Sequence, residues 1–133
     1  EAIGIQDSTL ENMVFLGYKD RDGLRDEYSQ GGISICPSVC LELFGLNWAE
    51  PMAAGCPVVA SSIGSLPEFL TGKGVLVPAR DAQRLAEAVI SLLKNKDYAK
   101  KLAGEGKRYA MESFDVRRAA DEIIDIYKQL IKG

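Results

Sequence analysis

Two glutamates and a glycine stand out as residues that could do chemistry together. Glu42 and Gly45 follow an apolar run that ends at Cys36, and Glu50 lies about one turn into the helical pattern that comes next. A loop that leads from a strand into a helix presents free backbone N–H groups and the positive end of the helix dipole to an anion. Gly45 has no side chain to keep an anion away from the backbone. Each carboxylate can accept hydrogen bonds from the two O–H groups of a sugar diol. This cluster would therefore suit a phosphorylated sugar.

The spacing of the two glutamates carries little information by itself. The chain holds ten glutamates, which give about one chance pair at this separation. Carboxylates that face solvent or lie in a first helical turn explain Glu42 and Glu50 more simply. Phe44, Trp48 and Met52 recur at every fourth residue, which favours a stripe of core side chains over a platform for stacking bases.

Short apolar runs and helical patterns alternate along the chain. Candidate buried strands lie at residues 13–16, 33–36, 57–60 and 75–78. Candidate helices lie at about 20–31, 46–54, 67–71, 81–93, 97–112 and 120–131, and Gly104 and Gly106 interrupt the fifth. Asp81 suits a helix N-cap, and Gly55 suits a C-terminal stop. Apolar strands that alternate with helices predict a parallel sheet covered on both faces, the α/β doubly wound class, which binds ligands where strands end and helices begin.

Composition excludes several classes of protein. The formal charge of −3 and the pI near 5.0 argue against a nucleic-acid partner bound through its phosphates. The chain has no histidine, which excludes a Ser-His-Asp triad and a histidine-ligated metal within it. Cys36, Cys40 and Cys56 lack the spacing of a metal site, and their place in or beside apolar runs favours buried free thiols in a reducing compartment. Without a transmembrane stretch or a signal-peptide pattern, the sequence predicts a soluble, cytoplasmic protein.

The wider pattern around the glutamates resembles a known family. Residues 42–61 read E-x-F-G-L-x3-E-x-M-A-x-G-x-P-V-V-A-S, and the runs V-F-L-G-Y, I-G-S-L-P-E and G-V-L-V-P follow the same order at 14–18, 63–68 and 74–78. Together they resemble the donor-binding motif and the other landmarks of the family 4 retaining glycosyltransferases, the glycosyl transferases group 1, which have the GT-B fold. The resemblance extends over about residues 11–130.

This resemblance implies a fold and an activity. Residues 1–133 would form a single C-terminal, nucleotide-sugar-binding domain, which is one Rossmann-like half of a GT-B fold without its first strand or strands. The N-terminal GT-B domain, which carries most of the acceptor site, would be missing from this chain. The whole enzyme would move a hexose from a UDP-, GDP- or ADP-linked sugar to a sugar, lipid or other acceptor. It would need no metal and no cofactor, and a peripheral membrane contact stays open.

Residue roles follow from the same resemblance. Glu42 would act at the catalytic centre by bonding hydroxyls of the donor hexose, and Glu50 would bind the ribose diol. Six further residues would contact the donor. Tyr18 and Lys19 would border the base, and Ser38 would lie in the loop before Glu42. The sugar or diphosphate would be contacted by Phe44, Gly45 and Leu46.

Two positions depart from the family pattern. Ser38 stands one residue farther from Glu42 than is usual. Pro51 replaces a small residue, which predicts a missing amide and a kink in the helix beside Glu50. The basic residues that hold the diphosphate in the family would precede Glu1, so we expect the chain alone to bind donor weakly and to be inactive.

Other interpretations remain for the same residues. The D-R-D sequence at 20–22 has the form of a metal-diphosphate motif, but its place before a short helix favours helix capping. A non-catalytic nucleotide-sugar-binding or interaction module of the same fold is the main alternative function. A sugar-nucleotide epimerase or a phosphorylase of this fold is a weaker one.

Overall fold

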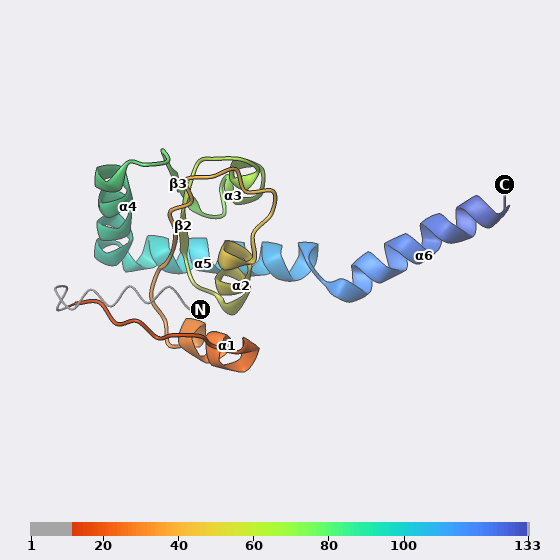
Figure 1. The fold of residues 1–133 in the computed structure, drawn as a ribbon, viewed down its shortest axis with the longest axis horizontal. Helices are drawn as coiled ribbons and strands as arrows, with labels where there is room; N and C mark the ends of the chain where they lie inside the picture. Colours follow the sequence, from red (N-terminus) through yellow and green to blue (C-terminus); the bar gives the residue numbers. More distant parts are fainter. Residues whose placement is uncertain (1–11, 133) are drawn as a thin grey trace.

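Three parallel strands form the centre of the fold. The computed structural model describes residues 12–132 of the chain. Strands β1 (Ser34–Cys36), β2 (Val58–Ser61) and β3 (Val75–Val77) lie in the order β1-β2-β3, and both pairs are parallel (Figure 1). Ser34 pairs with Val58, and Val59 pairs with Val75. The α/β class with a parallel sheet, expected from the alternating pattern, is confirmed.

Six helices accompany these strands within the described residues. They are α1 (Arg21–Ser29), α2 (Leu46–Ala54), α3 (Leu66–Leu70), α4 (Ala82–Lys94), α5 (Lys96–Ser113) and α6 (Val116–Lys132). Gly55 ends α2 in the left-handed conformation, with φ of 97°. The Asp81 side chain caps α4 by accepting the Arg84 amide at 2.9 Å. Both helix boundaries are therefore confirmed.

Helices cover both faces of the sheet, as a doubly wound fold requires. Successive side chains of a strand point to opposite faces. Val58 of β2 belongs to a buried cluster with Trp48 and Met52 of α2. Val59, the next residue, belongs to a second buried cluster with Leu92 of α4. Helix α5 contributes side chains to both clusters and runs across the whole domain (Figure 1).

The prediction of a strand at residues 13–16 is wrong. This run has no strand assignment, and its four side chains are between 51% and 79% exposed. A short apolar run expresses only a propensity, whereas a strand forms when an adjacent edge pairs with it. Within residues 12–132, the sheet consists of β1, β2 and β3, so the run has no paired neighbour there.

The prediction that glycines interrupt the fifth helix is also wrong. Helix α5 is continuous through Gly104 and Gly106. A Cβ on Gly106 would lie 3.1 Å from Cγ of Met52 and 3.1 Å from the carbonyl oxygen of Lys73. Gly106 therefore allows α5 to approach α2 closely, and this packing offsets the helix propensity that glycine lacks, about 1 kcal/mol relative to alanine.

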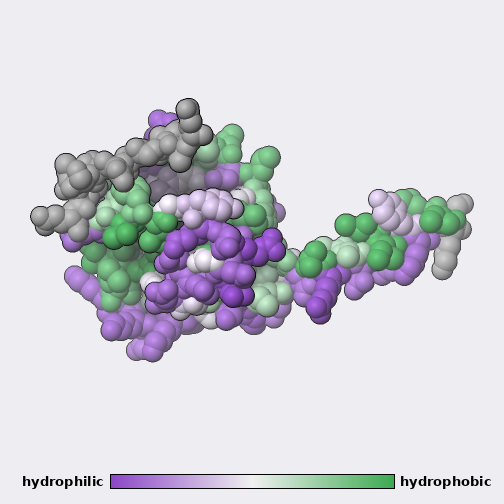
Figure 2. All heavy atoms as spheres, turned by 60° about the horizontal axis from the view of Figure 1, so that its bottom comes forward, coloured by the Kyte–Doolittle hydropathy of each residue, from purple (hydrophilic) through white to green (hydrophobic). Residues whose placement is uncertain are grey.

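The last helix projects away from the rest of the domain. Helix α6 follows α5 after a short turn and points away from the sheet (Figure 1). Its apolar side chains gather along one side (Figure 2) and include Ile123, Tyr127 and Leu130, which are 52%, 61% and 73% exposed. None of the helices that the structure describes has the length and hydropathy needed to span a bilayer.

Candidate functional site

The loop between β1 and α2 brings three of the expected site residues together. The Ser38 hydroxyl donates a hydrogen bond of 2.9 Å to Oε1 of Glu42. The second carboxylate oxygen of Glu42, Oε2, lies 3.2 Å from the point where a Cβ would sit on Gly45. Gly45 has φ of 81°, a conformation that favours glycine, and it directly precedes α2. The Glu42 carboxylate therefore lies close to the N-terminus of α2.

A second loop, which follows β2, holds the backbone of Glu42. The Ser65 amide donates to the Glu42 carbonyl at 3.0 Å, and its hydroxyl lies 2.9 Å from that oxygen and 2.6 Å from the Leu43 carbonyl. Gly64 has φ of 59°, and a Cβ there would collide with the Glu42 backbone. Sequence reasoning missed Gly64 and Ser65 as positioning residues. Their place directly after the C-terminal end of a strand was the usable signal.

Phe44 anchors the end of the Glu42 loop in the core. Its ring centroid lies 5.2 Å from that of Trp48, 5.3 Å from that of Phe69 and 5.1 Å from that of Phe114. The Trp48 indole N–H donates to the Phe44 carbonyl. Trp48 and Met52 are fully buried, so the core stripe that their spacing favoured is confirmed. This packing holds the first turn of α2, with its free amides, in one place.

Pro51 lies inside α2 next to Glu50, and a thiol replaces the hydrogen bond that it removes. An amide at position 51 would donate to the carbonyl of Asn47, four residues earlier. The Cys36 thiol, at the end of β1, donates to that same oxygen at 3.1 Å. Burial raises the pKa of Cys36 to about 11, and the Glu42 carboxylate adds to this shift. The thiol therefore keeps its proton at neutral pH and serves as the donor.

Glu50 lines two cavities, and both of them border α2. The first has a volume of about 300 Å³, and Phe44, Leu46 and Phe114 contribute to its lining with Glu50. The second has a volume of about 330 Å³ and lies between α1 and α2. Phe44, Leu46 and Glu50 therefore share one cavity, whereas Glu42 is not among the residues that line it.

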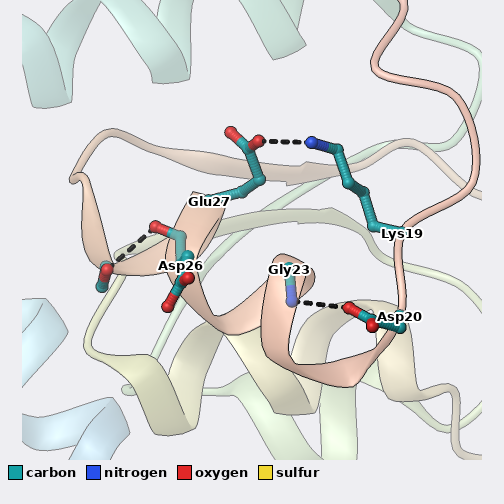
Figure 3. Close-up of polar contacts among 6 residues, drawn as sticks. Lys19, Asp20, Gly23, Asp26 and Glu27 are labelled. Carbon is teal, nitrogen blue, oxygen red and sulfur yellow. Dashed lines mark hydrogen bonds and ion pairs between the residues drawn. The ribbon is translucent and has the colours of Figure 1, made fainter.

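Tyr18 and Lys19 immediately precede α1. Tyr18 is 94% exposed. Lys19 Nζ forms an ion pair of 3.0 Å with Glu27 Oε1, which ties the chain before α1 to that helix (Figure 3). The Asp20 carboxylate accepts the Gly23 amide at 2.8 Å, so the capping role favoured for the D-R-D sequence is confirmed. Both expected base contacts thus lie beside the helix that forms one wall of the second cavity.

A comparison with protein families defines the class of this protein. The family described as glycosyl transferases group 1 matches residues 2–95, so the chain belongs to this family. The phosphatidyl-myo-inositol mannosyltransferase of Mycobacterium leprae is 32% identical over 121 residues, which cover 90% of this chain and 32% of that protein. The chain spans about a third of the length of the curated relatives that it matches.

Solved structures share the fold. Sucrose-phosphate synthase from Thermosynechococcus elongatus matches with a TM-score of 0.81 and 33% identity, over 90% of this chain and 30% of that one. HepE of Anabaena in complex with UDP-glucose matches with a TM-score of 0.82 and 25% identity, over 90% of this chain and 33% of that one. The parallel sheet with helices on both faces is accordingly one Rossmann-like half of a GT-B fold.

Proposed function

We propose that this chain is the C-terminal, donor-binding domain of a two-domain glycosyltransferase. The enzyme moves a hexose from a nucleotide-diphosphate sugar to a sugar, lipid or other acceptor, with retention of configuration. The observation that carries the proposal is the approach of the Glu42 carboxylate to Ser38 and Gly45 at the beginning of α2. A sugar diphosphate needs a carboxylate that accepts hydrogen bonds from its sugar hydroxyls and a helix N-terminus that binds its phosphates. Here the two lie side by side.

Each group has a separate task in this proposal. Glu42 accepts hydrogen bonds from hydroxyl groups of the donor hexose, and Glu50 accepts hydrogen bonds from the ribose diol. The first amides of α2, at Leu46 and Asn47, donate to the diphosphate oxygens. When the bond between the anomeric carbon and the diphosphate breaks, negative charge grows on the departing nucleoside diphosphate. Donors that are already aimed at this charge, together with the helix dipole, stabilise it.

The remaining parts of the proposal concern the parent protein. Its N-terminal domain supplies most of the acceptor site, and the transfer requires no metal and no bound cofactor. The UDP-glucose complex of HepE supports a nucleotide sugar as the class of donor. Cys40 is exposed, so the expectation of three buried thiols is wrong for this residue. The two buried thiols, those of Cys36 and Cys56, donate hydrogen bonds to backbone carbonyls, and this use of reduced cysteine fits the cytoplasm.

Isothermal titration calorimetry tests the proposal directly. We expect saturable binding of UDP, GDP or ADP to the chain, and the corresponding nucleotide sugar should bind more tightly than the bare nucleoside diphosphate. Glu42→Ala should weaken binding of the nucleotide sugar and leave binding of the bare diphosphate unchanged, because Glu42 contacts only the hexose. If none of the three nucleoside diphosphates binds, the proposal is overturned. Donor binding without transfer in the parent protein would support the non-catalytic module instead.

A further inference from the structure

The cavity between α1 and α2 has the size and lining of a small-molecule site. Its volume is about 330 Å³, and such sites typically begin at about 300 Å³. Helix α1 supplies Arg21, Leu24 and Tyr28, which recur at the intervals that place side chains on one helix face. Helix α2 supplies Glu50 and, as part of the apolar wall, Ala54. An apolar surface with a few polar groups is the usual composition of a ligand pocket.

The polar groups of this cavity are mainly hydrogen-bond donors. A guanidinium carries only donors, and both Arg21 and Arg25 line the cavity. The Arg25 guanidinium lies 3.4 Å from Asp22 and 3.9 Å from Asp26, so these carboxylates already engage it. Burial raises the pKa of Tyr28, and the Glu50 carboxylate raises it further, so the phenol stays protonated at neutral pH. Arg21 is therefore the charged donor that a ligand would meet first.

Glu50 links this cavity to the proposed donor site. It lines both cavities, and the other one also contains Leu46 at the N-terminus of α2, where the diphosphate is proposed to bind. A ribose has its diphosphate at one end and its base at the other. With the ribose on Glu50 and the diphosphate at α2, the base lies on the side of α1.

We infer that the cavity between α1 and α2 takes the base of the donor nucleotide, and that Arg21 selects a base with carbonyl oxygens, uracil or guanine, over adenine. This inference rests on the proposed function, because it uses the ribose contact of Glu50. The methylene and methyl groups of Leu24, Ala53 and Ala54 face the ring, and the guanidinium of Arg21 donates to its oxygens. Uracil and guanine present carbonyl acceptors, whereas adenine presents an amino donor in the corresponding place. A site that offers hydrogen-bond donors rejects a base whose facing edge has no acceptor for them.

The test compares three nucleotides on the chain and on matched variants. Isothermal titration calorimetry of the 133-residue chain should give dissociation constants for UDP or GDP about tenfold lower than that for ADP. Arg21→Gln should remove this preference, because a glutamine amide can pair with adenine as well. Arg84→Gln, which removes the same charge from an exposed position on α4, should keep the preference. Circular dichroism checks that both variants are folded.

A second variant tests the location of the base. Ala54→Leu fills the cavity and should weaken binding of all three nucleotides at least tenfold, while binding of inorganic pyrophosphate stays unchanged. Equal affinity for UDP, GDP and ADP, or a preference that survives Arg21→Gln, overturns the inference and leaves the proposed function in place. If none of the three nucleotides binds to the unmodified chain, the proposed function fails, and this inference fails with it.

Discussion

The loop around Glu42 and the segment before α1 both carry family patterns, yet they are held in very different ways. The Glu42 backbone bonds to Ser65, its carboxylate bonds to Ser38, and Phe44 packs against the buried ring of Trp48 and the half-buried ring of Phe114. In the segment at 13–18, by contrast, the large apolar side chains are more than half exposed. A sequence pattern therefore specifies a conformation most firmly where other parts of the chain contact it from several sides.

The strength of the contacts accounts for this difference. The ion pair between Lys19 and Glu27 follows the exposed segment, and both side chains are about a third exposed. Pairs in such surroundings contribute less than about 1 kcal/mol. The loop around Glu42 instead uses several hydrogen bonds, each worth about 1 kcal/mol, together with the burial of Phe44 against Trp48. Mutations should therefore damage the loop far more than the segment.

The largest effect is expected for Gly64→Ala. Alanine at φ of 59° is strained, and its Cβ would meet the backbone of Glu42. We expect a loss of about 3 kcal/mol in the free energy of unfolding, measured by urea denaturation. Gly72→Ala is the matched control, since φ there is 77° and nothing lies within 4 Å of the added Cβ. The cost of Gly72→Ala should stay near 1 kcal/mol. Equal costs at Gly64 and Gly72 would show that the loop of Gly64 does not touch the loop of Glu42 as described.

Loss of the Glu50 carboxylate should weaken donor binding. Glu50→Ala should reduce the affinity for the nucleotide by about 1.5–3 kcal/mol, the usual loss for a hydrogen bond to a charged group. Calorimetric titration with the nucleoside diphosphate that binds best measures the change. Glu87→Ala removes an exposed carboxylate from α4 and should leave the affinity unchanged. An affinity that Glu50→Ala does not alter would contradict the ribose contact.

A double-mutant cycle tests whether the Cys36 thiol replaces the hydrogen bond that is lost at Pro51. Cys36→Ala leaves the Asn47 carbonyl without its donor, whereas Pro51→Ala supplies a backbone amide to the same oxygen. Cys36→Ala should therefore cost about 1 kcal/mol less in the Pro51→Ala background than in the unmodified chain, as measured by urea denaturation. Cys56→Ala, whose thiol donates to the Tyr28 carbonyl, is the control and should cost the same in both backgrounds.

The same thiol predicts a pH dependence. The pKa of Cys36 rises from 9.0 to about 11 on folding, because burial disfavours the thiolate. Between these values the folded chain binds more protons than the unfolded chain, so stability is complete below pH 9 and falls as the pH rises towards 11. Urea midpoints measured across this range should fall less steeply for Cys36→Ala. Equal slopes for the two chains would place the Cys36 thiol in water rather than in the core.

Local signals explain which features could be predicted from the sequence. The bounds of α2, the capping by Asp20 and Asp81, and the stop at Gly55 depend on residues within one or two turns. The contact of Ser65 with Glu42 joins residues 23 positions apart, and no local pattern encodes it. The cavity beside Glu50 likewise depends on how α1 packs on α2. Tertiary contacts of this kind are what sequence patterns leave undetermined.

The smallest effect is expected in the exposed segment. Val14 is 79% exposed, whereas Val58 of β2 is fully buried. Val14→Ala should therefore change the free energy of unfolding by less than about 0.5 kcal/mol, while Val58→Ala should cost about 2 kcal/mol, both measured by urea denaturation. The two substitutions remove the same atoms, so their difference reports the surroundings alone. A cost above about 1 kcal/mol at Val14 would mean that the segment packs on a partner surface in solution, and the contrast with the Glu42 loop would disappear.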